Sequence, residues 1–127
     1  MINEIIALLD FFEFLNKKAG QLSGGYKRRL TMAIAIIGNP PILLLDEPST
    51  GVDPKGRRLM WQIISKISKE WKKCCVIITT HSIEEADVVS TKLTIMSKGN
   101  FVCFGSTGHI KNKYGSGYEL HIKLCQP

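Results

Sequence analysis

The sequence predicts an α/β fold, in which parallel strands with flanking helices are followed by a β-hairpin and a last helix. Two short apolar runs, at residues 42–45 and 76–78, have the length of buried strands, and a segment with helical periodicity follows each of them. This alternation of strand and helix is typical of a parallel sheet. Further along, Ser97-Lys98-Gly99-Asn100 separates two more strand-like runs and indicates a hairpin. With 127 residues, the chain is one domain or part of one.

The first third of the chain predicts two helices. Apolar residues recur at helical spacing over the first twelve residues, which indicates an amphipathic helix. Ser23 has the position of an N-cap, and the helix that it starts would run to about Ile37. Gly38-Asn39-Pro40-Pro41 ends this helix, because glycine releases a helix and proline cannot continue one. The side expected to face the core carries Tyr26, Leu30, Ile34 and Ile37.

The middle of the chain predicts two strands, each followed by a helix. Ile42–Asp46 is continuously apolar up to its last residue, the pattern of a strand covered on both faces. Asp53 and Pro54 fit the N-cap and the first position of the next helix, and a strand at residues 76–80 follows that helix. Ser82 then caps a short helix with acidic first turns. The buried side of the longer helix is expected to carry Leu59, Met60, Ile63, Ile64, Ile67 and Trp71.

The last third predicts the hairpin, a helix and a final strand. The hairpin strands are expected at residues 93–96 and 101–104, and either Ser106 or Thr107 caps a helix that ends near Tyr114. A last strand is expected at residues 118–124. No apolar stretch approaches the roughly 20 residues of a membrane-spanning helix. The N-terminus also lacks the basic region of a signal peptide.

The basic charge of the chain allows two interpretations. The formal net charge is +6, and Lys17, Lys18 and residues 27–29 form a basic stretch without an intervening acid. Such a stretch either contacts nucleic acid or an anionic membrane, or is a solvated helix face beside an anionic nucleotide site. We favour the second interpretation and expect no nucleic acid partner, because aromatic residues do not interleave with the basic ones.

The four cysteines predict neither a zinc site nor a disulfide. They form no C-x-x-C pair, and no histidine cluster accompanies them. Adjacent strand residues point to opposite faces, so Cys74 and Cys75 are poorly placed for a disulfide. We expect reduced, mostly buried thiols in a cytosolic protein, at Cys74, Cys75, Cys103 and Cys125.

Ser23-Gly24-Gly25, at the start of the second predicted helix, suits an anion. The two glycines let a ligand approach the backbone closely, and the first N–H groups of a helix carry partial positive charge. A terminal phosphate fits such a site. A plain helix cap with a flexible lead-in explains the same three residues, so the motif gains its weight from the segments that follow it.

Asp46 and Glu47 come at the carboxyl end of a predicted strand, where open α/β sheets bind their ligands. Consecutive strand residues face opposite ways, so the two carboxylates have different roles. One can hold a hydrated Mg²⁺, and the other can polarise a water for attack on a phosphoryl group. A solvated acidic turn is the alternative, but four aliphatic residues followed by Asp-Glu-Pro favour the functional interpretation.

Two further segments are expected near these carboxylates. His81 follows the next strand, so a parallel sheet brings its imidazole to the same edge, where it can donate to a phosphate or to the attacking water. Residues 49–54 form a loop of small residues that contains Asp53. This aspartate caps the following helix and is also available to a ligand site.

In this order and at this spacing, the four segments resemble the nucleotide-binding domain of ABC transporters. The resemblance identifies a signature helix at residues 22–38, a Walker B strand at 42–47, a D-loop at 49–54 and an H-loop at 81. It implies that residues 1–127 are the C-terminal portion of one such domain, with a partial P-loop NTPase (ABC ATPase) fold. Within the family, residues 36–40, 51–54 and 105–118 look like the A subfamily of eukaryotic transporters, many of which move lipids.

The resemblance implies ATP and Mg²⁺ as cofactors and assigns the catalytic residues. Asp46 would order Mg²⁺ through water, Glu47 would act as the general base, and His81 would be the switch histidine.

The resemblance also implies a partner domain. Ser23, Gly24 and Gly25 would contact the γ-phosphate of an ATP held by a second nucleotide-binding domain, and Asp53 would lie in the loop that crosses to it. The two domains would close head to tail and drive transmembrane domains from the cytosolic face of a membrane.

Two features depart from the family pattern. Tyr26 stands where many members have glutamine. The Walker A loop, the base-stacking aromatic and the Q-loop glutamine precede these motifs in the family, and the sequence contains no Gly-x-x-x-x-Gly-Lys-Ser/Thr. We therefore expect an incomplete ATP-binding and ATP-hydrolysing module that is inactive alone. Two alternatives stay open: a soluble ABC-type ATPase acting on ribosomes or nucleic acid, and a truncated, non-catalytic partner of another domain.

Overall fold

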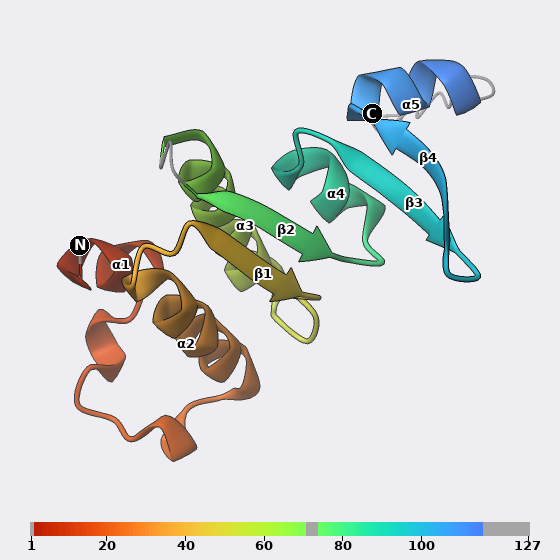
Figure 1. Cartoon of the computed structure of the whole chain (residues 1–127). Helices are drawn as coiled ribbons and strands as arrows, with labels where there is room; N and C mark the ends of the chain where they lie inside the picture. The colour runs from red at the N-terminus through yellow and green to blue at the C-terminus, as the bar shows by residue number, and fades with distance from the viewer. Residues whose placement is uncertain (1, 71–73, 116–127) are drawn as a thin grey trace, which may run out of the picture. The chain divides into compact units, whose positions relative to one another are not determined.

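The computed structural model describes residues 2–70 and 74–115, and the chain divides into two compact units, Met1–Ser90 and Thr91–Pro127. Two short 3₁₀ helices, Phe12–Phe14 and Ala19–Gln21, lie in the first unit between α1 and α2. The regular elements of this unit appear in Figure 1 and are α1 (Ile2–Leu8), α2 (Gly24–Ile37), β1 (Ile42–Asp46), α3 (Pro54–Glu70), β2 (Cys75–Thr79) and α4 (Ile83–Val89).

β1 and β2 form a parallel pair (Figure 1). Parallel strands need a crossover connection, and α3 provides it while packing against β2 and α4. The register sets Leu43 opposite Val76 and Asp46 opposite Thr79. The carboxyl ends of both strands therefore lie at one edge of the sheet, and the predicted α/β class is confirmed.

The core of the first unit is formed by α1, α2 and α3 together with one face of the strand pair. Leu43 and Leu45 of β1 are buried on that face. Leu59 is only half-buried, and Trp71 lies outside the described residues. The predicted stripe of α3 is otherwise confirmed, because four residues at helical spacing are almost fully buried: Met60, Ile63, Ile64 and Ile67.

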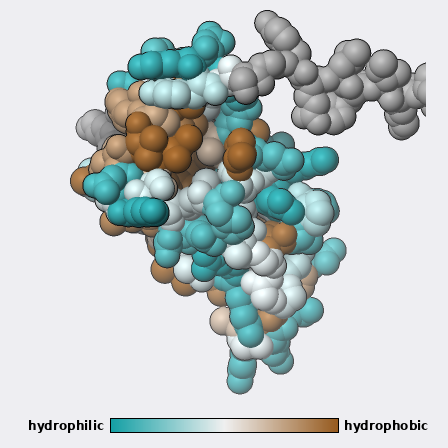
Figure 2. Space-filling view, turned by 90° about the vertical axis from the view of Figure 1, so that its right-hand side faces the viewer, coloured by the Kyte–Doolittle hydropathy of each residue, from teal (hydrophilic) through white to brown (hydrophobic). Residues whose placement is uncertain are grey.

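The other face of the strand pair is uncovered in the described part of the chain, although the sequence of β1 is typical of a strand covered on both faces. Ile42 and Leu44 are 60% and 70% exposed, and Ile77 of β2 is 54% exposed. A continuously apolar strand normally has an apolar partner on each face. The described residues cover only one of the two faces of the strand pair. Apolar side chains, drawn in brown, also reach the surface in the view of Figure 2.

α2 turns a different side to the core from the one predicted. Ile34 is 66% exposed and Ile37 is also exposed, while Tyr26 and Leu30 are half-buried. Both sides of the helix are rich in apolar residues, so periodicity alone does not choose between them. Contacts with α1 and α3 make the choice. The residues that they bury are Arg29, Met32, Ala33 and Ile36.

α1 ends earlier than predicted. The chain leaves the helix after Leu8 and turns at Asp10, whose φ of 57° lies in the left-handed region. Ile5 and Leu9 are buried as the periodicity indicates, but Phe12 is beyond the helix and exposed.

Side-chain caps start the later helices at the predicted residues. The Ser23 hydroxyl oxygen accepts the Tyr26 N–H at 3.4 Å, and the Ser82 hydroxyl oxygen accepts the Glu85 N–H at 3.2 Å. Asp53 Oδ2 accepts the Gly56 N–H at 3.1 Å and caps α3. Each cap satisfies an N–H group that has no partner within its helix.

The second unit contains β3 (Leu93–Ser97), β4 (Asn100–Gly105) and α5 (Thr107–Tyr114). The two strands pair antiparallel across Lys98 and Gly99, whose φ angles of 49° and 79° suit a two-residue hairpin turn. Ser106, rather than Thr107, caps α5 by accepting the His109 N–H at 3.2 Å. The hairpin and the helix are thus confirmed, and the strand predicted at residues 118–124 lies outside the described residues.

The cysteines are less buried than predicted. Cys75 is exposed, Cys74 and Cys103 are half-buried, and all three are free thiols. Cys75 lies on the uncovered side of the strand pair, which explains its exposure. Cys125 lies outside the described residues. Within the described ranges, none of the helices has both the length and the apolar character needed to cross a membrane.

Candidate functional site

Asp46 and Glu47 lie at the carboxyl end of β1, where β2 ends beside them. Thr79, the last residue of β2, donates its hydroxyl hydrogen to Oδ1 of Asp46. The backbone N–H of Glu47 donates to the Thr79 carbonyl oxygen at 3.0 Å and lies 3.3 Å from the Thr79 hydroxyl oxygen. Thr79 therefore orients the Asp46 side chain and ties the backbone of Glu47 to the neighbouring strand.

The Glu47 side chain is held between His81 and Thr50. Its Oε1 lies 3.1 Å from Nδ1 of His81, and its Oε2 accepts the Thr50 hydroxyl hydrogen at 3.0 Å. The His81 hydrogen bond, followed by the Thr50 hydrogen bond, holds the pKa of Glu47 below its ordinary value of 4.5. Partial burial and the charge of Asp46 act in the opposite direction and are outweighed. Glu47 is therefore an ionised carboxylate at neutral pH.

Glu47 also leaves the strand with an unusual backbone conformation. Its φ of 42° is in the left-handed region, which few residues other than glycine adopt. Such backbone strain persists only where the surroundings enforce it. Here the Glu47 N–H is bound to the Thr79 carbonyl oxygen and the Glu47 carboxylate to the Thr50 hydroxyl, and these two hydrogen bonds enforce the conformation.

The first turn of α2 presents its glycines in two different environments. Ser23 is the exposed N-cap, and a Cβ on Gly24 would meet no atom within 4 Å. A Cβ on Gly25 would lie 3.7 Å from Oδ1 of Asp53. Gly24 is thus open to a ligand, while Gly25 packs beside the loop that leads into α3.

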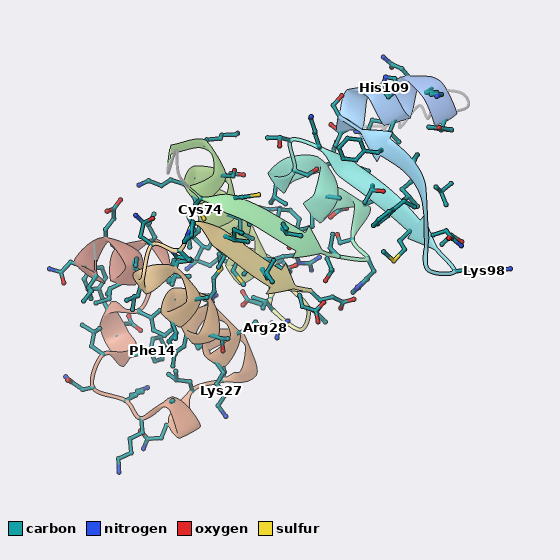
Figure 3. The ribbon with its side chains drawn as sticks, in the orientation of Figure 1. Phe14, Lys27, Arg28, Cys74, Lys98 and His109 are labelled. Carbon is teal, nitrogen blue, oxygen red and sulfur yellow. The ribbon has the colours of Figure 1, made fainter. Side chains whose placement is uncertain are left out.

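Arg28, one turn further along α2, reaches the backbone that follows β1. Figure 3 shows Arg28 on the side of α2 nearest the carboxyl end of β1. Nη2 donates to the carbonyl oxygens of Asp46 and Glu47, both at 2.7 Å, and Nε donates to that of Pro48 at 3.2 Å. One guanidinium therefore holds three consecutive carbonyls.

Arg29 is 3% exposed and pairs with Asp53. Its Nη2 lies 3.4 Å from Asp53 Oδ1, and its guanidinium stacks over the Tyr26 ring at 4.5 Å. The Gly56 N–H, with a smaller contribution from Arg29, holds the pKa of Asp53 below its ordinary value of 3.8. The Asp53 carboxylate is thus engaged by the cap of α3 and by α2.

These contacts correct the interpretation of the basic stretch as a solvated helix face. Arg29 is buried, and Arg28 is half-buried with its guanidinium bound to backbone carbonyls. The prediction of a solvated face is therefore wrong for these two arginines. Lys17 and Lys27 are exposed, and the Lys17 ammonium lies 4.8 Å from the centre of the Phe14 ring.

An open depression of about 490 Å³ joins the start of α2 to the end of β1. The structure therefore brings Gly24, Asp46 and Glu47 together. Ser23, Gly25, Asp53 and His81 do not line the depression, although His81 contacts Glu47. The residues that line it are Gly24, Arg28, Asp46, Glu47, Thr50 and Gly51.

Asp46 is the residue of this site that suits a divalent cation. In the described ranges, no three histidine, cysteine, aspartate or glutamate residues gather as a metal-binding group. Mg²⁺ does not require such a group, because one or two carboxylates with water and phosphate oxygens complete its coordination. A single carboxylate oriented by the Thr79 hydroxyl fits this requirement.

Three residues of the site are not singled out by the sequence motifs. The position of Thr79 could have been predicted from the sequence, because a parallel pairing in which both strands end together sets Thr79 beside Asp46. Thr50 lies three residues after Glu47, within reach of a turn. Arg28 carries no such signal, since it looks like one member of a basic run and its partners are backbone atoms.

Comparison with known sequences agrees with the motifs. The family model described as ABC transporter matches residues 1–50. The human retinal-specific phospholipid-transporting ATPase ABCA4 is 49% identical over 109 residues, which are 86% of this chain and 5% of that protein. The human glucosylceramide transporter ABCA12 is 43% identical over 123 residues, 97% of this chain and 5% of that protein. The chain thus spans about one twentieth of these relatives.

Comparison with solved structures agrees with the fold. The ATP-binding cassette MJ0796, in a dimeric post-hydrolysis state bound to ADP and Pi, superimposes with a TM-score of 0.72 at 27% identity. The match covers 91% of this chain and 46% of the MJ0796 chain, so the chain spans about half of a complete cassette. The motifs, the parallel strand pair and both comparisons lead to one conclusion: the chain belongs to the ABC transporter family and, within it, is most like sub-family A.

Proposed function

We propose that the chain is the C-terminal portion of a cassette that binds and hydrolyses ATP to drive transport across a membrane. The placement of Glu47 supports this proposal most strongly. An ionised carboxylate stands at the carboxyl end of β1, fixed by His81 and Thr50, in the same depression as Gly24. Hydrolysis of a phosphoanhydride requires a group that orients the attacking water, and Glu47 has the charge and the rigidity for this role.

Glu47 would accept the proton of the attacking water. Its lowered pKa keeps it in the basic form at neutral pH. His81 would fix the carboxylate by donating its Nδ1–H to Oε1, and in the imidazolium form, in which both ring nitrogens carry hydrogen, its Nε2–H would also donate to a phosphate oxygen.

Asp46 would hold Mg²⁺ through water molecules. Its carboxylate is oriented by Thr79 and lies beside Glu47 in the depression. When bound, Mg²⁺ neutralises part of the charge on the phosphates.

A second nucleotide-binding domain would create two sites, in each of which the signature segment of one domain faces the ATP held by the other. Ser23, Gly24 and Gly25 at the start of α2 would contact the γ-phosphate of an ATP held by that partner, and Asp53 would lie in the loop facing it. The dimeric state of MJ0796 supports such an arrangement.

Lipids are the proposed cargo, and the cytosolic face of a membrane is the proposed location. Both rest on the relatives, whose names describe the transport of phospholipids or glucosylceramide. Transmembrane domains elsewhere in the complete polypeptide would carry the lipid. The chain alone would hydrolyse no ATP, since its sequence contains no phosphate-cradling Gly-x-x-x-x-Gly-Lys-Ser/Thr loop.

An antibody raised against the chain tests this proposal by showing the size and location of the native polypeptide. We expect a band far above 14.2 kDa in the membrane fraction, and ATP hydrolysis by the purified polypeptide but not by the 127-residue chain. A soluble band at 14.2 kDa would overturn the proposal of a transporter.

A further inference from the structure

Arg28 joins the signature segment to the carboxyl end of β1, two segments that are separate in the sequence and that the proposed function assigns to different ATP molecules. It lies in the second turn of α2, shortly after Ser23-Gly24-Gly25, and it lines the depression together with Asp46 and Glu47. Its guanidinium is half-buried and spans the carbonyl oxygens of Asp46, Glu47 and Pro48. No other described residue links α2 to the chain just after β1 by side-chain hydrogen bonds of this length.

The geometry of these three bonds suits arginine and no other side chain. Guanidinium is planar and carries five N–H donors in a fixed arrangement, so Nε and Nη2 can address separate acceptors at once. The carbonyls converge because the chain turns at Glu47, whose φ is 42°. A lysine retains the positive charge but is a compact point donor on a flexible stem. It would not hold the same set of carbonyls.

We propose that Arg28 is a positioning residue for Glu47. Arg28 fixes the backbone from which the Glu47 carboxylate extends, so that the orientation of the base depends on the signature helix. Two of the three acceptors belong to the carboxylate residues themselves, and the third is the next residue of the chain. This inference rests on the proposed function, because it assigns Arg28 to the reaction for which Glu47 is the base.

Arg28 also couples the signature segment to Glu47. Ser23–Gly25 and Arg28 are carried by the same short stretch of α2, and a movement of its first turns shifts the guanidinium. The guanidinium in turn donates a hydrogen bond to the Glu47 carbonyl oxygen at 2.7 Å. Engagement of the signature segment by a phosphate is therefore linked to the position of Glu47 through one side chain.

Arg28→Lys, made in the complete polypeptide that carries this chain, is the test. Arg58→Lys is the matched control, because it makes the same exchange at an exposed arginine of α3 that lies outside the depression. We expect Arg28→Lys to lower kcat for ATP hydrolysis about tenfold and to leave KM within about twofold, since a small misplacement of a catalytic group costs rate more than affinity. Arg58→Lys should leave both unchanged. Hydrogen exchange should accelerate at the Glu47 and Thr50 amides in Arg28→Lys only.

Each outcome decides the proposal. Unchanged kcat in Arg28→Lys, with or without faster exchange at residues 47–50, would reduce Arg28 to a structural contact and overturn it. A raised KM at unchanged kcat would assign Arg28 to nucleotide binding and overturn it as well. Glu47→Gln, measured in parallel, distinguishes failure of the Arg28 proposal from failure of the proposed function. If Glu47→Gln abolishes hydrolysis and Arg28→Lys does not slow it, only the Arg28 proposal fails. If Glu47→Gln hydrolyses normally, both fail.

Discussion

Glu47 carries the proposed chemistry because several neighbours act on it at once. His81 and Thr50 hold its two carboxylate oxygens, Thr79 holds its N–H, and Arg28 holds its carbonyl. A residue with so many fixed contacts loses little orientational freedom in the reaction, which is the condition for an effective base. Each of these contacts is also polar, so the site depends on pH and on single substitutions.

The melting temperature at acid pH should reveal the stabilisation contributed by the carboxylates whose pKa is lowered. Hydrogen bonds from Lys66, His81 and Gly56 lower the pKa of Glu4, Glu47 and Asp53, respectively. A carboxyl group with a lower pKa in the folded state stabilises the fold above its unfolded pKa, and this stabilisation is lost as pH falls through the folded value. We expect the melting temperature to be flat from pH 7 to about 5.5 and to fall below about pH 4.5.

Glu4→Gln provides the comparison for this pH profile. The variant removes the 2.9 Å pair with Lys66, so its melting temperature should fall less steeply in acid than that of the wild type. A melting temperature that rises as pH falls below 4.5 would contradict the sign of the pKa shifts.

Gly56→Ala should destabilise the first unit although alanine favours helices. A Cβ on Gly56 would lie 2.4 Å from Nη2 of Arg29, 2.7 Å from Val52 and 2.8 Å from Asp53. Forcing such contacts in a packed region costs about 1–3 kcal/mol, more than the ~0.5–1 kcal/mol that alanine gains over glycine inside a helix. Urea unfolding measures the difference.

Gly38→Ala is the control for Gly56→Ala. Gly38 has a φ of −77°, which alanine adopts, and a Cβ there would meet no atom within 4 Å. We expect a change within about 0.5 kcal/mol, the usual range for surface substitutions. Equal destabilisation by both substitutions would show that the loss at Gly56 comes from the backbone and not from the close approach of Arg29.

β1 and α2 show how much of an element its sequence specifies. The bounds of both elements follow from local signals, namely the Ser23 cap, the prolines after Ile37 and the apolar run that starts at Ile42. Their buried faces do not, because each carries apolar residues on both sides. Tertiary contacts choose the buried face, so this part of the structure is not contained in the periodicity.

The candidate site was predictable to a similar degree. Parallel pairing brings His81 to Glu47, since both follow the ends of neighbouring strands. Burial of Arg29 and the carbonyl contacts of Arg28 were not predictable, because side chains that bind backbone atoms leave no paired residue to find in the sequence. Charge alone suggested a solvated face for both.

The two faces of β1 should respond differently to a polar residue. Leu43 is buried and Leu44 is 70% exposed. Leu43→Asn should lower the free energy of unfolding of the chain by about 3 kcal/mol or more, because it removes a buried leucine and buries an amide. Leu44→Asn should change it little and should raise the soluble fraction of the chain, since it interrupts an exposed apolar surface.

Unfolding in urea and the soluble fraction after expression measure these two effects. Equal destabilisation by Leu43→Asn and Leu44→Asn would mean that the second face of β1 is covered within the chain.

The chain as a whole contains some parts of a cassette and not others. It spans about half of the solved cassette MJ0796, and its sequence lacks the phosphate-cradling loop that the family pattern requires. One apolar face of the strand pair is also exposed, at Ile42, Leu44 and Ile77, as expected if the segments that cover it in a whole cassette are missing. We therefore propose that the activity belongs to a longer polypeptide.

The role of Glu47 as the base is tested by the rate of ATP hydrolysis of Glu47→Gln in that complete polypeptide. We expect a fall of about 10²-fold or more with ATP still bound, because the variant keeps the shape of the side chain and removes the base. Glu84→Gln, an exposed acid on α4 outside the site, should hydrolyse ATP at the rate of the wild type. Hydrolysis at the wild-type rate in Glu47→Gln would contradict the assignment of Glu47 and the mechanism built on it.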